Sequence, residues 1–188
     1  MLKRLCGNGA LRFVIAFLLI YGCLSAGNYI WAGMTIPGGY YSKWLDYNAD
    51  YISGLRYIIL KGAAALLKLF GYDNYVSGYY LHVCSGKTIR MVYSCIGLNI
   101  TSAWWALNLS FPQALRSRVI HIITGTIIIT MLNMIRIALV ALSPTKGKFL
   151  NSPFDHHTIF NFIAYGIIIM MMFRIINRSA NKINACER

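Results

Sequence analysis

Long apolar runs are the feature that most constrains how this chain can fold. They cover about residues 12–31, 94–111, 119–142 and 157–176. A helix needs about 20 mainly apolar residues to cross a bilayer core. Only 12% of the residues are charged, whereas soluble domains have about a quarter. The sequence therefore predicts an all-α polytopic membrane protein, with about four transmembrane helices in a single transmembrane domain over residues 1–188.

The distribution of basic residues predicts the orientation. The net charge is +13, from 18 Lys+Arg against 5 Asp+Glu, and many basic residues lie at the chain ends or in the 112–118 loop. The positive-inside rule assigns these segments to the cytoplasm. Four spans place both termini there, in a multi-pass protein of the inner (cytoplasmic) membrane. Because the basic residues flank apolar spans, we expect membrane lipid and no nucleic acid as partners.

Two segments between the first and second spans have other patterns. Residues 50–71 have polar and charged side chains, such as Lys61 and Lys68, near one helical face, which indicates an amphipathic helix in the membrane interface. A span with snorkelling lysines is the alternative, but a fifth span would separate the termini. Residues 79–93 contain two strand-like stretches around a turn at 84–87, which predict a short extracytoplasmic β-hairpin.

Three reactive side chains are expected at the extracytoplasmic side. Cys95 and His157 begin the second and fourth spans, and Arg136 lies near the end of the third. An arginine inside a span costs several kcal/mol and indicates function. Each also has a structural interpretation: inert packing for the cysteine, an ion pair with Asp155 for the arginine, and a helix cap for the histidine.

Other chemistries lack their motifs. The five cysteines form no CxxC pair, and the sequence has no HExxH motif and no pair of aspartates inside a span. We therefore expect no metal and no cofactor, and we do not expect an aspartyl intramembrane protease.

The order of three short motifs resembles the exosortase/archaeosortase family of membrane-embedded, cysteine transpeptidase-like enzymes. The motifs are Cys95-Ile96-Gly97, Asn133-Met134-Ile135-Arg136 and His157-Thr158-Ile159-Phe160. The resemblance covers roughly residues 50–176. Two positions depart from the family pattern: Ile96 replaces a small polar residue, and Asn161 replaces a glycine.

The resemblance implies a cysteine peptidase or transpeptidase. Its substrates would be exported proteins with a C-terminal sorting signal, which consists of a short motif, a transmembrane helix and a basic tail. Cys95 would form a thioester, His157 would act as base and then acid, and Arg136 would stabilise the oxyanion or the thiolate. A surface acceptor would then take the protein. Asn133 and His156 would have supporting roles, and His156 stays an alternative to His157 as the base.

Two other functions remain open at the level of sequence. A non-enzymatic assembly or secretion partner would use the hairpin and the interfacial helix for docking. A small transporter would use Arg136 in an anion path, although the chain has neither internal repeats nor acidic residues inside its spans. The sorting motif, the acceptor and the oligomeric state do not follow from these patterns.

Overall fold

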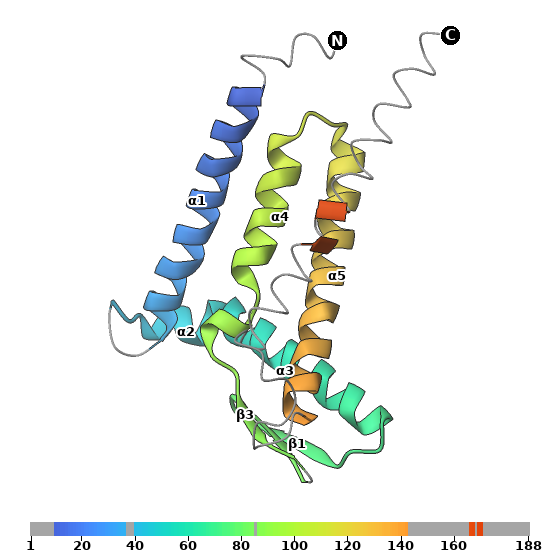
Figure 1. The fold of residues 1–188 in the computed structure, drawn as a ribbon. Coiled ribbons are helices and arrows are strands. Elements are labelled where there is room, and N and C mark those ends of the chain that lie inside the picture. The colour runs from blue at the N-terminus through green and yellow to red at the C-terminus, as the bar shows by residue number, and fades with distance from the viewer. Residues whose placement is uncertain (1–9, 37–39, 85, 143–165, 168, 171–188) are drawn as a thin grey trace, which may run out of the picture. The chain divides into compact units, whose positions relative to one another are not determined.

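A computed structural model describes residues 10–36, 40–84, 86–142, 166–167 and 169–170. The chain divides into two compact units, Met1–Lys146 and Gly147–Arg188. The first unit contains, in chain order, α1 (Ala10–Thr35), α2 (Lys43–Ala49), α3 (Tyr51–Leu69), β1 (Asn74–Ser77), β2 (Tyr80–Val83), β3 (Thr88–Arg90), the 3-10 helix η3 (Tyr93–Cys95), α4 (Leu98–Ser110) and α5 (Leu115–Leu142) (Figure 1). In the second unit, residues 166–167 and 169–170 are helical. The rest of the expected fourth span lies outside the described residues.

Helices α1, α4 and α5 lie side by side, with α4 in contact with both others (Figure 1). Two contacts show that α1 and α4 are antiparallel. The ring of Phe13 packs edge-on against Phe111, with 6.4 Å between ring centroids. Further along, Asn28 Nδ2 donates a hydrogen bond of 2.9 Å to Ser102 Oγ. The N-terminal end of α1 therefore lies beside the α4–α5 connection.

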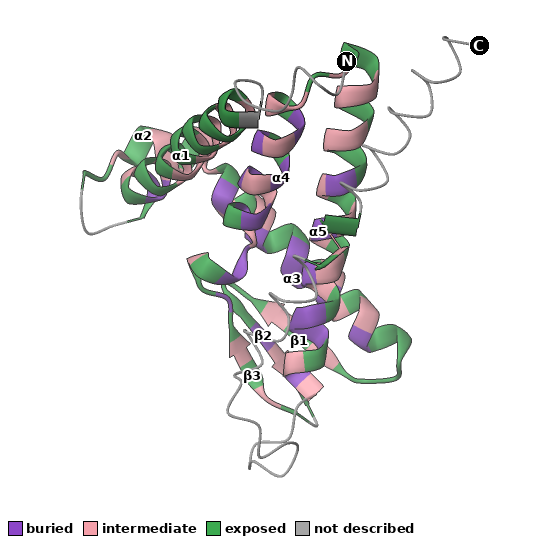
Figure 2. Cartoon of the chain, turned by 45° about the horizontal axis from the view of Figure 1, so that its top comes forward, coloured by how far each residue is buried: buried purple, intermediate pink, exposed green. Residues whose placement is uncertain are grey.

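Two of the described helices are long and apolar enough to cross a membrane, Leu11–Thr35 in α1 and all of α5. Helix α1 is exposed along most of its length (Figure 2), and its exposed side chains include Leu18 and Leu19. Such an apolar surface is typical of a helix that contacts lipid tails. By length and composition, these helices support the predicted membrane protein.

The expected second span, 94–111, is shorter in the structure. Helix α4 begins at Leu98 and has 13 residues, which corresponds to about 20 Å at 1.5 Å per residue, whereas the hydrocarbon core is about 30 Å thick. The helix cannot begin at Ser94 because Gly97 adopts a left-handed conformation with φ +83°. Residues 93–95 instead form η3.

Helix α3 lies within the expected helix 50–71 and has one buried face. Its buried side chains recur at intervals of three or four residues, apart from the adjacent Ile59 and Leu60: Ile52, Arg56, Ile59, Leu60, Ala63 and Leu67. That spacing places them on one side of an α-helix. Helix α3 contacts both α5 and β1, and it is not among the described helices that are apolar enough to span. Its position in the membrane interface stays a prediction.

Residues 74–90 form a three-stranded antiparallel sheet in the order β1-β2-β3. Strands β2 and β3 lie in the region of the expected hairpin. The sequence analysis missed β1, because this strand has only four residues, Asn74–Ser77, and is partly polar. One face of the sheet, with Leu81 and Val83, is buried in the core. The other face is exposed and aromatic, and Tyr75 stacks on His82 with 4.6 Å between centroids.

A single apolar core joins the sheet to α3, η3 and α5. It includes Ile59, Leu81, Met91, Cys95 and Ile137, all of them buried. Burial of apolar surface contributes about 25 cal/mol per Å², so this core fixes the turn that contains Cys95 against both α3 and α5.

Candidate functional site

The peptide around Cys95 is a tight turn between the sheet and α4. Val92 is extended, and Cys95 N–H donates to the Val92 carbonyl oxygen over 3.0 Å within η3. Gly97 then reverses the chain direction at φ +83°, a conformation that costs residues with a Cβ about 1–2 kcal/mol. The Cys-x-Gly sequence thus forms a turn that holds the thiol at the start of α4.

Asn133 on α5 holds this turn in place. Its Nδ2 donates hydrogen bonds of 2.9 Å to the carbonyl oxygens of both Cys95 and Ile96. The side chain is only 2% exposed, so these bonds form away from water. A Cβ at Gly97 would lie 3.4 Å from Asn133 Nδ2. That distance is an ordinary van der Waals contact, so the glycine is required here for the positive φ angle of the turn.

Arg136 lies one turn after Asn133 on α5 and is brought to the same place. Its Nη2 lies 3.6 Å from Cys95 Sγ, and its Nη1 lies 3.4 Å from Asn133 Oδ1. Cys95 and Arg136 are both buried, with 7% of each residue exposed. The structure thus joins two of the three residues that the sequence suggested as catalytic. His156 and His157 lie outside the described residues.

This arrangement suits nucleophilic chemistry at sulfur. A guanidinium group stabilises a neighbouring thiolate, the nucleophilic form of cysteine, and it also stabilises an oxyanion that forms near it. Tyr93 lies two residues before Cys95. Burial is the main cause that raises the pKa of Tyr93 above 10.0, and the nearby Tyr51 and Tyr29 raise it further. Its phenol therefore stays protonated at neutral pH. The described residues contain no group of side chains suited to hold a metal ion.

Arg56 is a second buried arginine, and the sequence analysis did not single it out. It is 6% exposed, and its guanidinium carbon lies 4.1 Å from the centroid of the Tyr79 ring. Its Nε is buried without a hydrogen-bond partner. The spacing from Ile52 and Ile59 could have placed Arg56 on the buried face, since residues four and three apart share one side of a helix.

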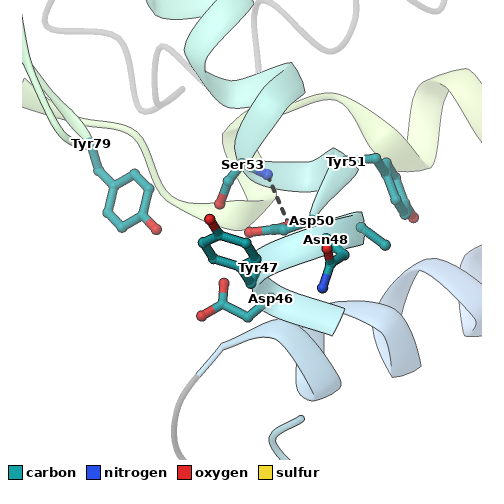
Figure 3. Close-up of a pocket in the computed structure, with 8 residues that line it drawn as sticks. Asp46, Tyr47, Asn48, Asp50, Tyr51, Ser53 and Tyr79 are labelled. Carbon is teal, nitrogen blue, oxygen red and sulfur yellow. Dashed lines mark hydrogen bonds between the residues drawn. The ribbon is translucent and has the colours of Figure 1, made fainter. Parts of the chain in front are cut away.

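An open hollow of about 730 Å³ lies between α2, the start of α3 and Tyr79 (Figure 3). Two carboxylates line it, and both have structural partners. Asp50 Oδ1 accepts a hydrogen bond from Ser53 N–H and caps α3. Asp46 accepts a 2.8 Å hydrogen bond from the Tyr41 hydroxyl, and this bond raises the pKa of Tyr41. Cys95 and Arg136 do not line this hollow.

The pKa of Tyr51, which also lines the hollow, is raised above 10.0 by burial and, to a smaller extent, by the charge of Asp50. Its hydroxyl donates a hydrogen bond to Asn28 Oδ1 on α1. The tyrosine therefore stays protonated at neutral pH and joins α1 to α3 as a hydrogen-bond donor.

Comparison with known families gives a match over most of the chain. The family model described as "Transmembrane exosortase" matches residues 9–174 of the chain. The searches of curated proteins and of solved structures found no match.

Proposed function

The chain belongs to the transmembrane exosortase family, a family of sorting-related membrane enzymes, and on this premise we propose that it is a cysteine peptidase or transpeptidase. Its substrates are exported proteins, which it cleaves at their C-terminal sorting signals on the extracytoplasmic side and passes to a surface acceptor. The observation that carries the proposal is the 3.6 Å contact between Arg136 Nη2 and Cys95 Sγ. A cation beside a buried thiol is a typical environment for a nucleophilic cysteine.

The first chemical step is acyl transfer to sulfur. His157 takes the proton of the Cys95 thiol as general base. The resulting thiolate attacks the scissile carbonyl carbon, and a C–S bond forms while the carbonyl electrons move to oxygen. The Arg136 guanidinium stabilises this oxyanion. When the intermediate collapses, the C–N bond breaks, and the leaving amine takes a proton from His157 acting as general acid. A thioester and the released C-terminal segment are the products.

The second step regenerates the enzyme. An acceptor nucleophile loses a proton to His157 and attacks the thioester carbonyl, after which the C–S bond breaks and Cys95 leaves as a thiolate. Transfer results when the acceptor is an amine or a hydroxyl group, and hydrolysis results when it is water. Asn133 supports both steps as a positioning residue, because it fixes the carbonyl groups of Cys95 and Ile96.

The test is to replace Cys95 and follow the processing of a co-expressed substrate that carries a motif, a transmembrane helix and a basic tail. We expect Cys95→Ala and Cys95→Ser to leave the substrate uncleaved. Cys84→Ser is the matched control, because Cys84 is a free and exposed cysteine. Normal processing by Cys95→Ala would falsify the proposal. Uncleaved substrate that co-purifies equally with every variant, the native chain included, would indicate a non-enzymatic partner.

A further inference from the structure

The outer edge of β3 leads directly into the turn that contains Cys95. The strand Thr88–Arg90 is followed by Met91, the extended Val92 and then η3, which ends at Cys95. Strand β3 is at the edge of the sheet, because the order is β1-β2-β3. A residue paired beside Val92 would lie about 6 Å along a 3-10 helix from Cys95, at about 2 Å per residue.

The hydrogen-bond pattern shows which backbone groups of this edge are free. Met91 N–H donates to the Tyr79 carbonyl oxygen over 2.9 Å, and the register pairs Ile89 with Leu81. In an antiparallel ladder, alternate residues of a strand point their N–H and C=O groups toward the same neighbour. Ile89 and Met91 therefore bond to β2, and Thr88 and Arg90 point their backbone groups away from the sheet.

No backbone hydrogen bond within the described residues involves Thr88 or Arg90 on that outer side. Both residues are exposed, as is Val92. An edge with unpaired N–H and C=O groups is a ready template for an added strand. The segment from Thr88 to Val92 is about 16 Å long at about 3.3 Å per residue, which suits a short extended peptide.

We propose that the segment of the substrate that enters the active site binds as a fourth strand along the outer edge of β3. This inference rests on the proposed function, and it assigns the way in which the substrate is held. Main-chain hydrogen bonds to Thr88 and Arg90 align the segment, as in other cases of strand addition. The strand leads the scissile bond to Cys95, since β3 itself runs into the Cys95 turn.

The charges at this edge favour the substrate segment that enters the active site over the basic tail of the sorting signal. Lys87 precedes β3, and Arg90 ends it, with its guanidinium carbon 6.0 Å from the centroid of the Tyr80 ring. The added strand therefore has an acidic or neutral side chain beside Arg90. The basic tail of the sorting signal does not bind at this edge, because like charges would repel it.

A proline at position 90 is the direct test. Because the Arg90 N–H points away from β2, Arg90→Pro removes only the outward donor, and edge strands tolerate proline at such positions. We expect processing of the co-expressed substrate to fall at least about tenfold, which corresponds to about 1.4 kcal/mol. Arg90→Ala keeps the N–H and is expected to lower processing no more than about threefold, or about 0.7 kcal/mol.

Val76→Pro is the control on the opposite edge, and its melting temperature in detergent is measured beside its cleavage because the half-buried Val76 packs against the core. By the same alternation its N–H points away from β2, because the register places Val76 beside Leu81 while Tyr75 pairs with His82. Cleavage should continue in this variant. The inference is overturned if Arg90→Pro cleaves as fast as Arg90→Ala. Cleavage that does not depend on Cys95 would instead contradict the proposed function, so the two failures are distinguishable.

A second measurement decides the case if Arg90→Pro does not fold. A photo-crosslinking amino acid replaces Thr88 in a full-length chain that carries Cys95→Ala, so that uncleaved substrate stays bound. We expect crosslinks between position 88 and the substrate residues just before its transmembrane helix, and fewer from the same amino acid at Tyr75 on β1. A crosslink yield at position 88 no higher than at position 75 would overturn the inference.

Discussion

At the scale of single residues, one asparagine and one glycine fix the geometry around Cys95. Asn133 bonds to two consecutive carbonyl groups, and Gly97 provides the positive φ angle between them and α4. Cys95 and Arg136 could be selected from the sequence, because the cysteine begins one expected span and an arginine inside another is costly unless it has a function. The hydrogen bonds of Asn133 could not be predicted from the sequence, since they depend on a turn 37 residues away from it.

Asn133→Ala should impair both stability and activity. The substitution leaves the carbonyl groups of Cys95 and Ile96 unpaired in the core, which costs about 1–3 kcal/mol. We expect a lower melting temperature in detergent and at least about a tenfold loss of processing, the equivalent of about 1.4 kcal/mol. If Asn133→Ala retains native processing, Asn133 does not position the Cys95 turn.

Gly97→Ala should destabilise the chain by about 1–2 kcal/mol, because a Cβ disfavours the left-handed conformation. Gly54→Ala is the control, since a Cβ at Gly54 meets nothing within 4 Å and alanine is about 0.5–1 kcal/mol better than glycine inside a helix. Thermal unfolding of the two variants should shift in opposite directions. Equal melting temperatures for Gly97→Ala and the native chain would show that the turn relaxes.

The pair formed by Arg56 and Tyr79 offers a double-mutant cycle. Tyr79→Ala exposes one face of a guanidinium that lies 4.1 Å from the ring centroid, and a partly desolvated cation–π contact contributes about 1–2 kcal/mol. In an Arg56→Met background the same substitution should cost less by that amount. Unfolding measured for all four proteins checks the coupling, and additive effects would mean that the two side chains do not stabilise each other.

At the scale of elements, helix α4 packs closely on α5 at Gly125. A Cβ at Gly125 would clash with the indole of Trp104, which is fully buried and donates a 3.0 Å hydrogen bond to the His121 carbonyl oxygen. The long apolar runs predicted two helices here, but the start of α4 depended on Gly97. Strand β1 was missed because four residues give too short a pattern to predict a strand. Its pairing with β2 is what defines it.

Gly125→Ala and Gly62→Ala compare the cost of adding a Cβ beside a rigid side chain, Trp104, with the cost beside a flexible one, Met134. A Cβ at Gly62 would meet the side-chain end of Met134, which can move, because methionine has three rotatable bonds. The indole beside Gly125 has no such freedom, and overpacking costs typically about 1–3 kcal/mol. We expect Gly125→Ala to melt at a lower temperature than Gly62→Ala in the same detergent. The reverse order would contradict the packing of α4 on α5.

At the scale of the whole first unit, the elements divide between two ends. The N-terminal end of α1 and the α4–α5 connection lie together, as the Phe13–Phe111 contact shows. The sheet, α3 and the Cys95 turn lie toward the opposite ends of α4 and α5 (Figure 1). Positive-inside reasoning groups Arg12 with Arg116 and Arg118, and the structure places the segments that carry these residues near one another.

Labelling from outside the cell tests which end faces the cytoplasm. In a chain whose native cysteines are replaced, a cysteine introduced at Asn74 should react with a membrane-impermeant maleimide in intact cells. One introduced at Arg116 should react only after the cells are permeabilised. Native Cys84 is exposed beside β2 and, restored alone, should behave as the Asn74 position does. A cysteine at Lys148, outside the described residues, should also react from outside.

The opposite labelling pattern would place Cys95 on the cytoplasmic side, and exported proteins could not then meet it there. This outcome would contradict both the proposed cleavage at the extracytoplasmic side and the binding of substrate along β3. Labelling of both positions in intact cells would instead indicate leaky cells, which a cytoplasmic reporter protein with a free thiol detects. The result at Arg116 decides the orientation more directly than the result at Asn74. Arg116 lies at the very start of α5, which begins at Leu115, and the short connection before it cannot cross the membrane.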